Sequence, residues 1–206
     1  MGFCRTNLFK RLESSGKVFL QSVESHILRN HIVLRAIEQE TPIPIGTQDP
    51  EMLDARIYDE DAEAPEVTLN VFEDEEDETA RDRSAGPLRM EVDFKRRAAG
   101  IYDEYSKQYK GRFKWLRPGL FVKTLAKDLQ SDATALLGVL KKAGEWNDNQ
   151  DAKLKALVDL ITKKHPTEKI LIFSQFADTV RYIEARLKAA GVHALAGATG
   201  DSSDPT

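Results

Sequence analysis

The stretch that decides the fold is KILIFSQFADTVRYIEARLKAAGVHALAG, residues 169–197. Its four consecutive apolar residues, 170–173, are typical of a strand that is covered on both faces in a parallel sheet. Helical spacing follows, with Ile183 and Leu187 four residues apart, and Gly191 suits the C-terminal cap of that helix. A second apolar run comes after the cap. The order predicts a strand, a helix and a second strand.

Such a unit needs a parallel neighbour, reached by a right-handed crossover. Two strands alone do not make a stable open sheet, because too little apolar surface is covered. We therefore expect the rest of the sheet to lie outside these 206 residues, in a larger protein of which this chain is a middle piece.

The remainder of the chain has mainly helical patterning, so the expected fold class is mainly α with a partial α/β unit at the C-terminal end. The predicted segments are a helical segment 1–40, a disordered acidic linker or insertion 41–87, a helical region 88–150, and the truncated start of an α/β domain, 151–206. A break is expected near Ser15, between a short helix and a long one.

Composition indicates a cytoplasmic protein without a membrane partner. Hydrophobic residues make up 41% of the chain and charged residues 31%, and one cysteine leaves no disulfide within it. We find no apolar run near the roughly 20 residues that a membrane span needs. The first residues lack the apolar core of a secretory signal.

Charge is unevenly distributed. The net charge is −4, but residues 57–80 hold eleven acidic residues and no Lys or Arg, whereas residues 81–206 hold 23 Lys and Arg against 16 Asp and Glu. The acidic run is typical of a solvated, disordered loop. An alternative is an acidic segment that competes with nucleic acid for a basic surface.

The sequence contains neither a phosphate-binding G-x-x-x-x-G-K-[ST] loop nor an H-E-x-x-H or G-x-S-x-G motif. We therefore expect no catalytic residues, no metal site and no cofactor in this chain itself.

Two turns carry candidate ligand contacts. Ser174 and Gln175 follow the first predicted strand, and Thr199 and Gly200 follow the second. Small polar residues at the carboxyl ends of parallel strands suit a phosphate, because ligands bind at this edge of an open sheet. Good turn-forming residues without a ligand are the equal alternative.

A third candidate is the basic stretch around Phe113 and Trp115, where Lys110, Arg112 and Lys114 alternate with aromatic residues. Aromatic rings among cations can stack on bases while the cations neutralise phosphates. The competing interpretation is that both rings pack under the domain and only the basic side chains reach water.

Two stretches resemble a known family. KLKALVDLITKKHPTEKILIFSQFADTVRYIEARLKAAGV, residues 153–192, resembles the opening of the second RecA-like domain in Swi/Snf-type members of the superfamily-two helicases. LFKRLESSGKVFLQSVESHILRN, residues 8–30, resembles a segment between the two RecA-like lobes of large bacterial helicases of this type.

The resemblance implies a parent protein that hydrolyses ATP, with Mg²⁺, to move along DNA. Its partners would be DNA, the first RecA-like lobe and the remainder of the second lobe, because the ATP-binding motifs of both are not in this sequence. Ser174 and Gln175 match the position of the family's fourth motif, near the nucleic-acid backbone. Thr199 and Gly200 fall where such lobes touch phosphate again.

Two other functions stay open. One is a stand-alone helical protein-interaction module whose acidic loop recruits a basic partner. The other is a helical brace that binds no ligand.

Overall fold

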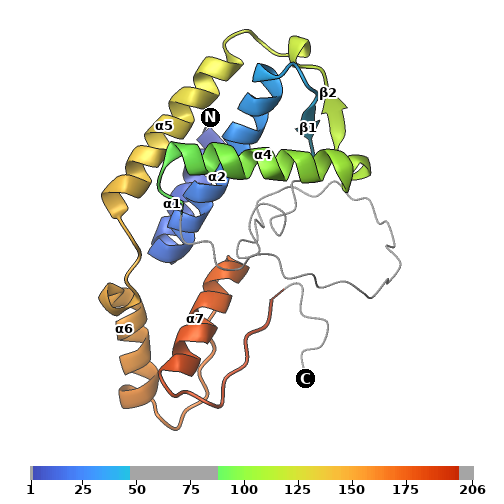
Figure 1. Ribbon diagram of the computed structural model, residues 1–206. Coiled ribbons are helices and arrows are strands. Elements are labelled where there is room, and N and C mark those ends of the chain that lie inside the picture. Colours follow the sequence, from blue (N-terminus) through green and yellow to red (C-terminus); the bar gives the residue numbers. More distant parts are fainter. Residues whose placement is uncertain (1, 47–87, 200–206) are drawn as a thin grey trace. The chain divides into compact units, whose positions relative to one another are not determined.

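The computed structural model describes residues 2–46 and 88–199, and it is mainly helical, as the sequence predicts (Figure 1). The acidic run 57–80 lies outside the described residues, so its predicted disorder stays a prediction. No helix in the two described ranges combines the length and apolar character that crossing a membrane requires.

The chain forms two compact units. One contains residues 1–23 and 143–206, and the other contains residues 24–142. The first helical segment of the sequence is therefore divided, because one long helix continues from the first unit into the second.

Helix α1 is Gly2–Ser14 and helix α2 is Gly16–Glu38. Only Ser15 separates them, which confirms the predicted break between a short helix and a long one. Glycine at position 16 allows a close approach, because a Cβ there would lie 2.6 Å from the Trp146 ring. The start of α2 is thus packed directly against Trp146.

The unit of residues 24–142 packs the rest of α2 with α4 (Glu91–Lys107) and α5 (Leu125–Ala143) (Figure 1). Apolar residues at helical spacing fill its core because each helix turns one stripe inward. Fully or almost fully buried members include Ile27, Ile32, Ile43, Phe94, Ala98, Ile101, Tyr105 and Leu140. Side chains also tie the helices together, since Asn30 of α2 donates to the Leu129 carbonyl of α5.

A short ribbon completes this unit. Strand β1 (Ile43–Ile45) pairs antiparallel with β2 (Lys114–Leu116), with Pro44 opposite Trp115. Strand β1 lies within the segment 41–87, which the sequence assigned to a disordered linker. Two-stranded ribbons need support from a packed partner. Here the Trp115 ring of β2 contacts the rings of Tyr102 and Phe113.

Two sequence-based helix boundaries in this unit are wrong. The spacing of Tyr102, Tyr105 and Tyr109 predicts a helix over about 88–112, but helix α4 ends at Lys107, and a 3-10 turn, Lys110–Arg112, follows it. The helical spacing of Val122, Leu125 and Leu129 predicts that Val122 belongs to the buried stripe of the next helix, but Val122 lies before α5 and is 71% exposed. The stripe was extended too far because apolar spacing alone does not mark where a helix starts.

The other unit contains α6 (Ala152–Asp159), one π-helical turn, Leu160–Lys164, and α7 (Ala177–Ala189). The Asp151 side chain caps α6 by accepting the Leu154 N–H at 3.0 Å. The short polar side chains of Asp148 and Asn149 predict that one of them caps this helix, and that prediction is wrong by two to three residues. Gly191 follows α7 at φ +86°, as expected of a glycine that ends a helix.

The strands predicted on either side of α7 are not formed. Residues 169–175 and 192–199 have no strand pairing among the described residues. Leu171 is 81% exposed and Phe173 is 89% exposed, whereas the sequence predicted burial on both faces. The physical reason is that a strand is held by a neighbouring ladder and a covering layer, and the described residues provide neither.

Candidate functional site

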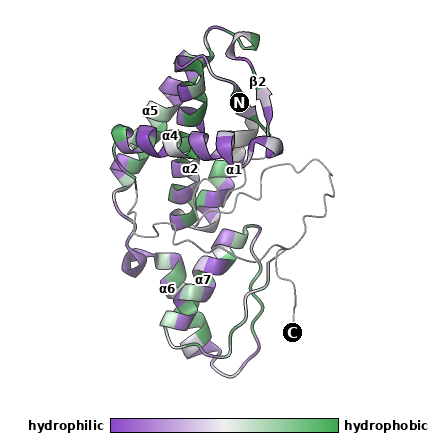
Figure 2. Ribbon diagram, turned by 45° about the vertical axis from the view of Figure 1, so that its right-hand side comes forward, coloured by the Kyte–Doolittle hydropathy of each residue, from purple (hydrophilic) through white to green (hydrophobic). Residues whose placement is uncertain are grey.

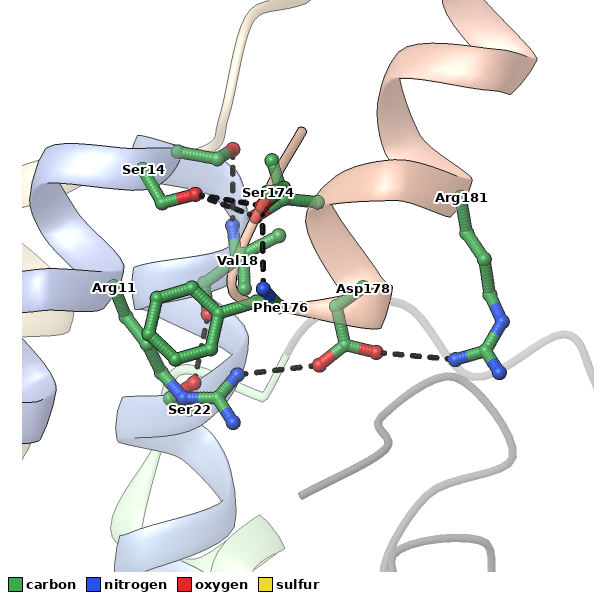
Figure 3. Close-up of polar contacts among 10 residues, drawn as sticks. Arg11, Ser14, Val18, Ser22, Ser174, Phe176, Asp178 and Arg181 are labelled. Atoms are coloured by element: carbon green, nitrogen blue, oxygen red, sulfur yellow. Dashed lines mark hydrogen bonds and ion pairs between the residues drawn. The ribbon is translucent and has the colours of Figure 1, made fainter. Parts of the chain in front are cut away.

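The turn before α7 is held by hydroxyl contacts (Figure 3). The Ser174 Oγ accepts the Phe176 N–H at 3.2 Å and lies 3.4 Å from the Ser14 Oγ. The Ser14 Oγ is also 2.9 Å from the Thr179 Oγ1. The Ser174 hydroxyl therefore shapes the turn and joins it to α1, while the neighbouring Gln175 is exposed to solvent.

A buried ion pair lies beside this turn. Arg11 of α1 donates through Nη1 to the Asp178 Oδ2 at 3.2 Å, and the two side chains are 3% and 6% exposed. Arg181 approaches the other carboxylate oxygen of Asp178 at 3.6 Å. The Arg11 guanidinium also lies 4.6 Å from the centre of the Phe176 ring (Figure 3).

The carboxylate of Asp178 thus faces two arginines. The N-cap residue of α7, Phe176, makes no side-chain cap hydrogen bond. A carboxylate in the first turn stabilises a helix through the macrodipole, so Asp178 serves both α7 and its attachment to α1. This pair was missed in the sequence because residues 11 and 178 share no local pattern.

The second predicted turn is only partly described. Thr199 is half-buried in the extended segment after α7, and Gly200 lies outside the described residues. The prediction that this turn adds phosphate contacts at the same sheet edge as Ser174 and Gln175 stays a prediction.

A polar cluster surrounds Tyr182, and the sequence did not predict it. The Trp146 Nε1–H points to the Tyr182 hydroxyl at 3.3 Å, and this hydroxyl lies 3.1 Å from the Asp148 Oδ1 and 3.0 Å from the Asp151 Oδ2. Burial and the two carboxylates raise the pKa of Tyr182 above its ordinary value. Arg186 forms an ion pair with Asp148. The one feature of the sequence that could have indicated this cluster is Trp146, a large aromatic residue in an otherwise polar turn.

A hollow of about 430 Å³ adjoins the cluster. Its lining residues are Glu145, Trp146, Asn147, Asp148, Asn149 and Arg186. Two of these residues are engaged in the protein itself, because the Asn147 side chain accepts the Asn149 N–H at 3.0 Å and Asp148 is paired with Arg186. The described residues contain no group of three or more His, Cys, Asp or Glu that could hold a metal ion. The cluster therefore joins α6 to α7.

In the basic stretch around Phe113 and Trp115, these two rings pack within the protein and the cations are exposed. Phe113 is 7% exposed and stacks on Tyr105, with ring centres 4.4 Å apart. Trp115 meets the edge of Tyr102 at 5.9 Å and donates its Nε1–H to the Lys110 carbonyl at 2.8 Å. These contacts favour the packing interpretation of Phe113 and Trp115 over base stacking.

The candidate cations face solvent. Lys110, Arg112 and Lys114 are all exposed. The Arg112 guanidinium lies 5.3 Å from the centre of the Tyr109 ring. The structure thus brings these three predicted contacts together on one short segment, which belongs to a different unit from Ser174 and Gln175.

Comparison of the chain with models of protein families, with curated protein sequences and with solved structures gave no match.

Proposed function

We propose that this chain is part of an ATP-dependent DNA helicase or translocase. It would supply the helical brace between the two motor lobes and the first part of the C-terminal RecA-like lobe, without being catalytic alone. ATP and Mg²⁺ would bind the complete protein, whose other lobe and remaining strands lie outside this sequence.

The observation that carries the proposal is the state of residues 170–173. They have the composition of a doubly covered parallel strand, but Leu171 and Phe173 are almost fully exposed. Exposed apolar residues in a row are costly in water, by roughly 25 cal/mol for each Å² that could be buried. Neighbouring strands and a covering layer from a larger α/β domain would remove that cost.

The helix that follows supports the same function. Helix α7 begins directly after the polar turn and is fixed by the buried Arg11–Asp178 pair. Open α/β sheets place their ligand contacts in the turns between a strand and the following helix, and the turn before α7 would take that position in the complete lobe. Ser174 and Gln175 would lie near the DNA backbone in the complete lobe, and the resemblance of residues 153–192 to the family supports this role.

The experiment is an immunoblot of source cells with antibodies raised against this chain. The proposal predicts a native product several times heavier than the 23.2 kDa of these residues. A native product of 23.2 kDa would overturn it, because the lobes that bind ATP would then be absent.

A stand-alone protein-interaction module is the second candidate, favoured by the eleven acidic residues of 57–80. A pull-down from source cells separates the two functions. Capture of a basic protein partner that is lost when 57–80 is replaced by a neutral sequence, and is insensitive to DNA, would favour the module.

A further inference from the structure

Five cations lie within eleven residues of the second unit, and no acidic residue stands among them. We call this set the basic surface: Lys107, Lys110, Arg112, Lys114 and Arg117, all of which are exposed. The set begins at the end of α4, continues through a 3-10 turn and β2, and ends before the turn Pro118–Leu120. Figure 2 shows that much of α4, at whose end the set begins, is hydrophilic.

Charge on this surface is poorly compensated. Some cations elsewhere in the same unit are paired, as Arg35 is with Asp103 at 3.1 Å and Arg96 with Asp93 at 2.7 Å. In contrast, Lys107, Lys110, Lys114 and Arg117 form no ion pair with any residue in the part of the chain that the structure describes. Like charges on one short segment add their potentials and attract a polyanion.

The segment has a fixed framework behind it. Two of its three rings, Phe113 and Trp115, pack in a cluster with Tyr102 and Tyr105, and the third, Tyr109, is half-buried with the Arg112 guanidinium 5.3 Å from its centre. Tyr102 is anchored in turn, since its hydroxyl donates to the Pro42 carbonyl at 2.8 Å. Phe113 and Trp115 therefore hold the backbone of the basic surface through contacts within the protein, and Phe113 is buried.

We propose that the basic surface binds the phosphate backbone of duplex DNA without reading bases. The choice of DNA as the ligand rests on the proposed function. The basic surface is a second contact surface, and it belongs to a different unit from the turn before α7. Exposed cations beside rings that are buried or half-buried match a ligand whose charge is regular and independent of sequence.

Duplex DNA fits better than a single strand or an acidic peptide. A duplex presents one negative charge per about 1.7 Å of its axis, twice the density of one strand. Single strands gain affinity from stacking on aromatic rings, which are engaged here. A protein partner would need apolar area to bury, but Leu116, at 37% exposed, is the one exposed aliphatic side chain between residues 107 and 117.

The test is fluorescence anisotropy of the 206-residue chain with a labelled duplex and with one of its strands, at several salt concentrations. The triple variant K110Q/R112Q/K114Q should bind the duplex roughly tenfold or more weakly, with a salt slope reduced by about 3, because three phosphate contacts are lost. The control K141Q/K142Q/K155Q, which removes three exposed lysines outside the basic surface, should bind like the parent chain.

A second readout separates phosphate contact from stacking. In a Trp146→Phe chain, Trp115 is the remaining tryptophan, and its emission should stay unchanged when duplex binds. Strong quenching by a single strand that binds more tightly than the duplex would overturn the proposal. Equal loss of binding in both triple variants would overturn it too, as would tighter binding of a synthetic acidic peptide.

Failure here is distinguishable from failure of the proposed function. A heavy native product with ATPase activity, together with a basic surface that does not bind DNA, would leave the motor proposal standing. If the native product is 23.2 kDa and the basic surface binds duplex DNA, the basic-surface proposal stands and the motor proposal is overturned.

Discussion

At the scale of single residues, a few positions hold the two parts of the first unit, residues 1–23 and 143–206, together. Gly16 accommodates the Trp146 ring, and Arg11 holds Asp178 in a buried pair. Each joins a residue from the first 23 positions to one beyond 143, and such long-range contacts leave no periodic trace in the sequence. That is why the helices could be predicted from apolar spacing, whereas these contacts could not.

Gly16→Ala should lower the stability of the chain although alanine favours helices. An added Cβ would lie 2.6 Å from two atoms of Trp146, so the expected loss is about 1–3 kcal/mol from overpacking. Gly100→Ala is the matched control, because that glycine of α4 has nothing within 4 Å of the new Cβ. It should gain about 0.5–1 kcal/mol from helix propensity. Urea denaturation measures both, and a stabilising Gly16→Ala would contradict the packing.

Asp178→Ala should cost about 3–5 kcal/mol, because the Arg11 guanidinium would stay buried without its carboxylate. The control on the same helix is Glu184→Ala, which removes the more exposed pair with Lys188 and should cost less than about 1 kcal/mol. Urea denaturation again provides the values. Similar losses in the two variants would contradict the burial of the Arg11–Asp178 pair.

At the scale of elements, helices and strands differ in how far the sequence determined them. Helices α2, α4 and α5 follow their apolar stripes because their hydrogen bonds are internal to each segment. The strand 170–173 was predicted from equally good local signals but does not form, since its hydrogen-bond partners must come from another segment. The ribbon of β1 and β2 was missed for the same reason, because its register depends on distant residues.

The double variant Leu171→Ser/Phe173→Ser should leave the stability of this chain within about 0.5 kcal/mol per site, because both side chains are already exposed. Its concentration-dependent self-association should fall, since an apolar extended segment is a template for edge pairing. Phe94→Ser is the contrasting variant, at a fully buried position, and should lose several kcal/mol. Chemical denaturation and light scattering measure these effects. A large loss of stability in the double variant would show that 170–173 is packed.

At the scale of the whole molecule, two compact units carry different parts of the proposed function. The unit of residues 1–23 and 143–206 presents the unpaired apolar segment and the turn before α7, and the unit of residues 24–142 carries the basic surface. The sequence predicted both kinds of feature, since apolar runs and charge runs are local. It did not predict the division into units, because α2 continues across it.

The measurement that tests the central claim most directly is DNA-dependent ATP hydrolysis by the native product, captured from source cells with an antibody to this chain. The account predicts a polypeptide much heavier than 23.2 kDa whose hydrolysis rate rises when duplex DNA is added. A captured product of 23.2 kDa, or a heavy product that hydrolyses no ATP with DNA present, would contradict it.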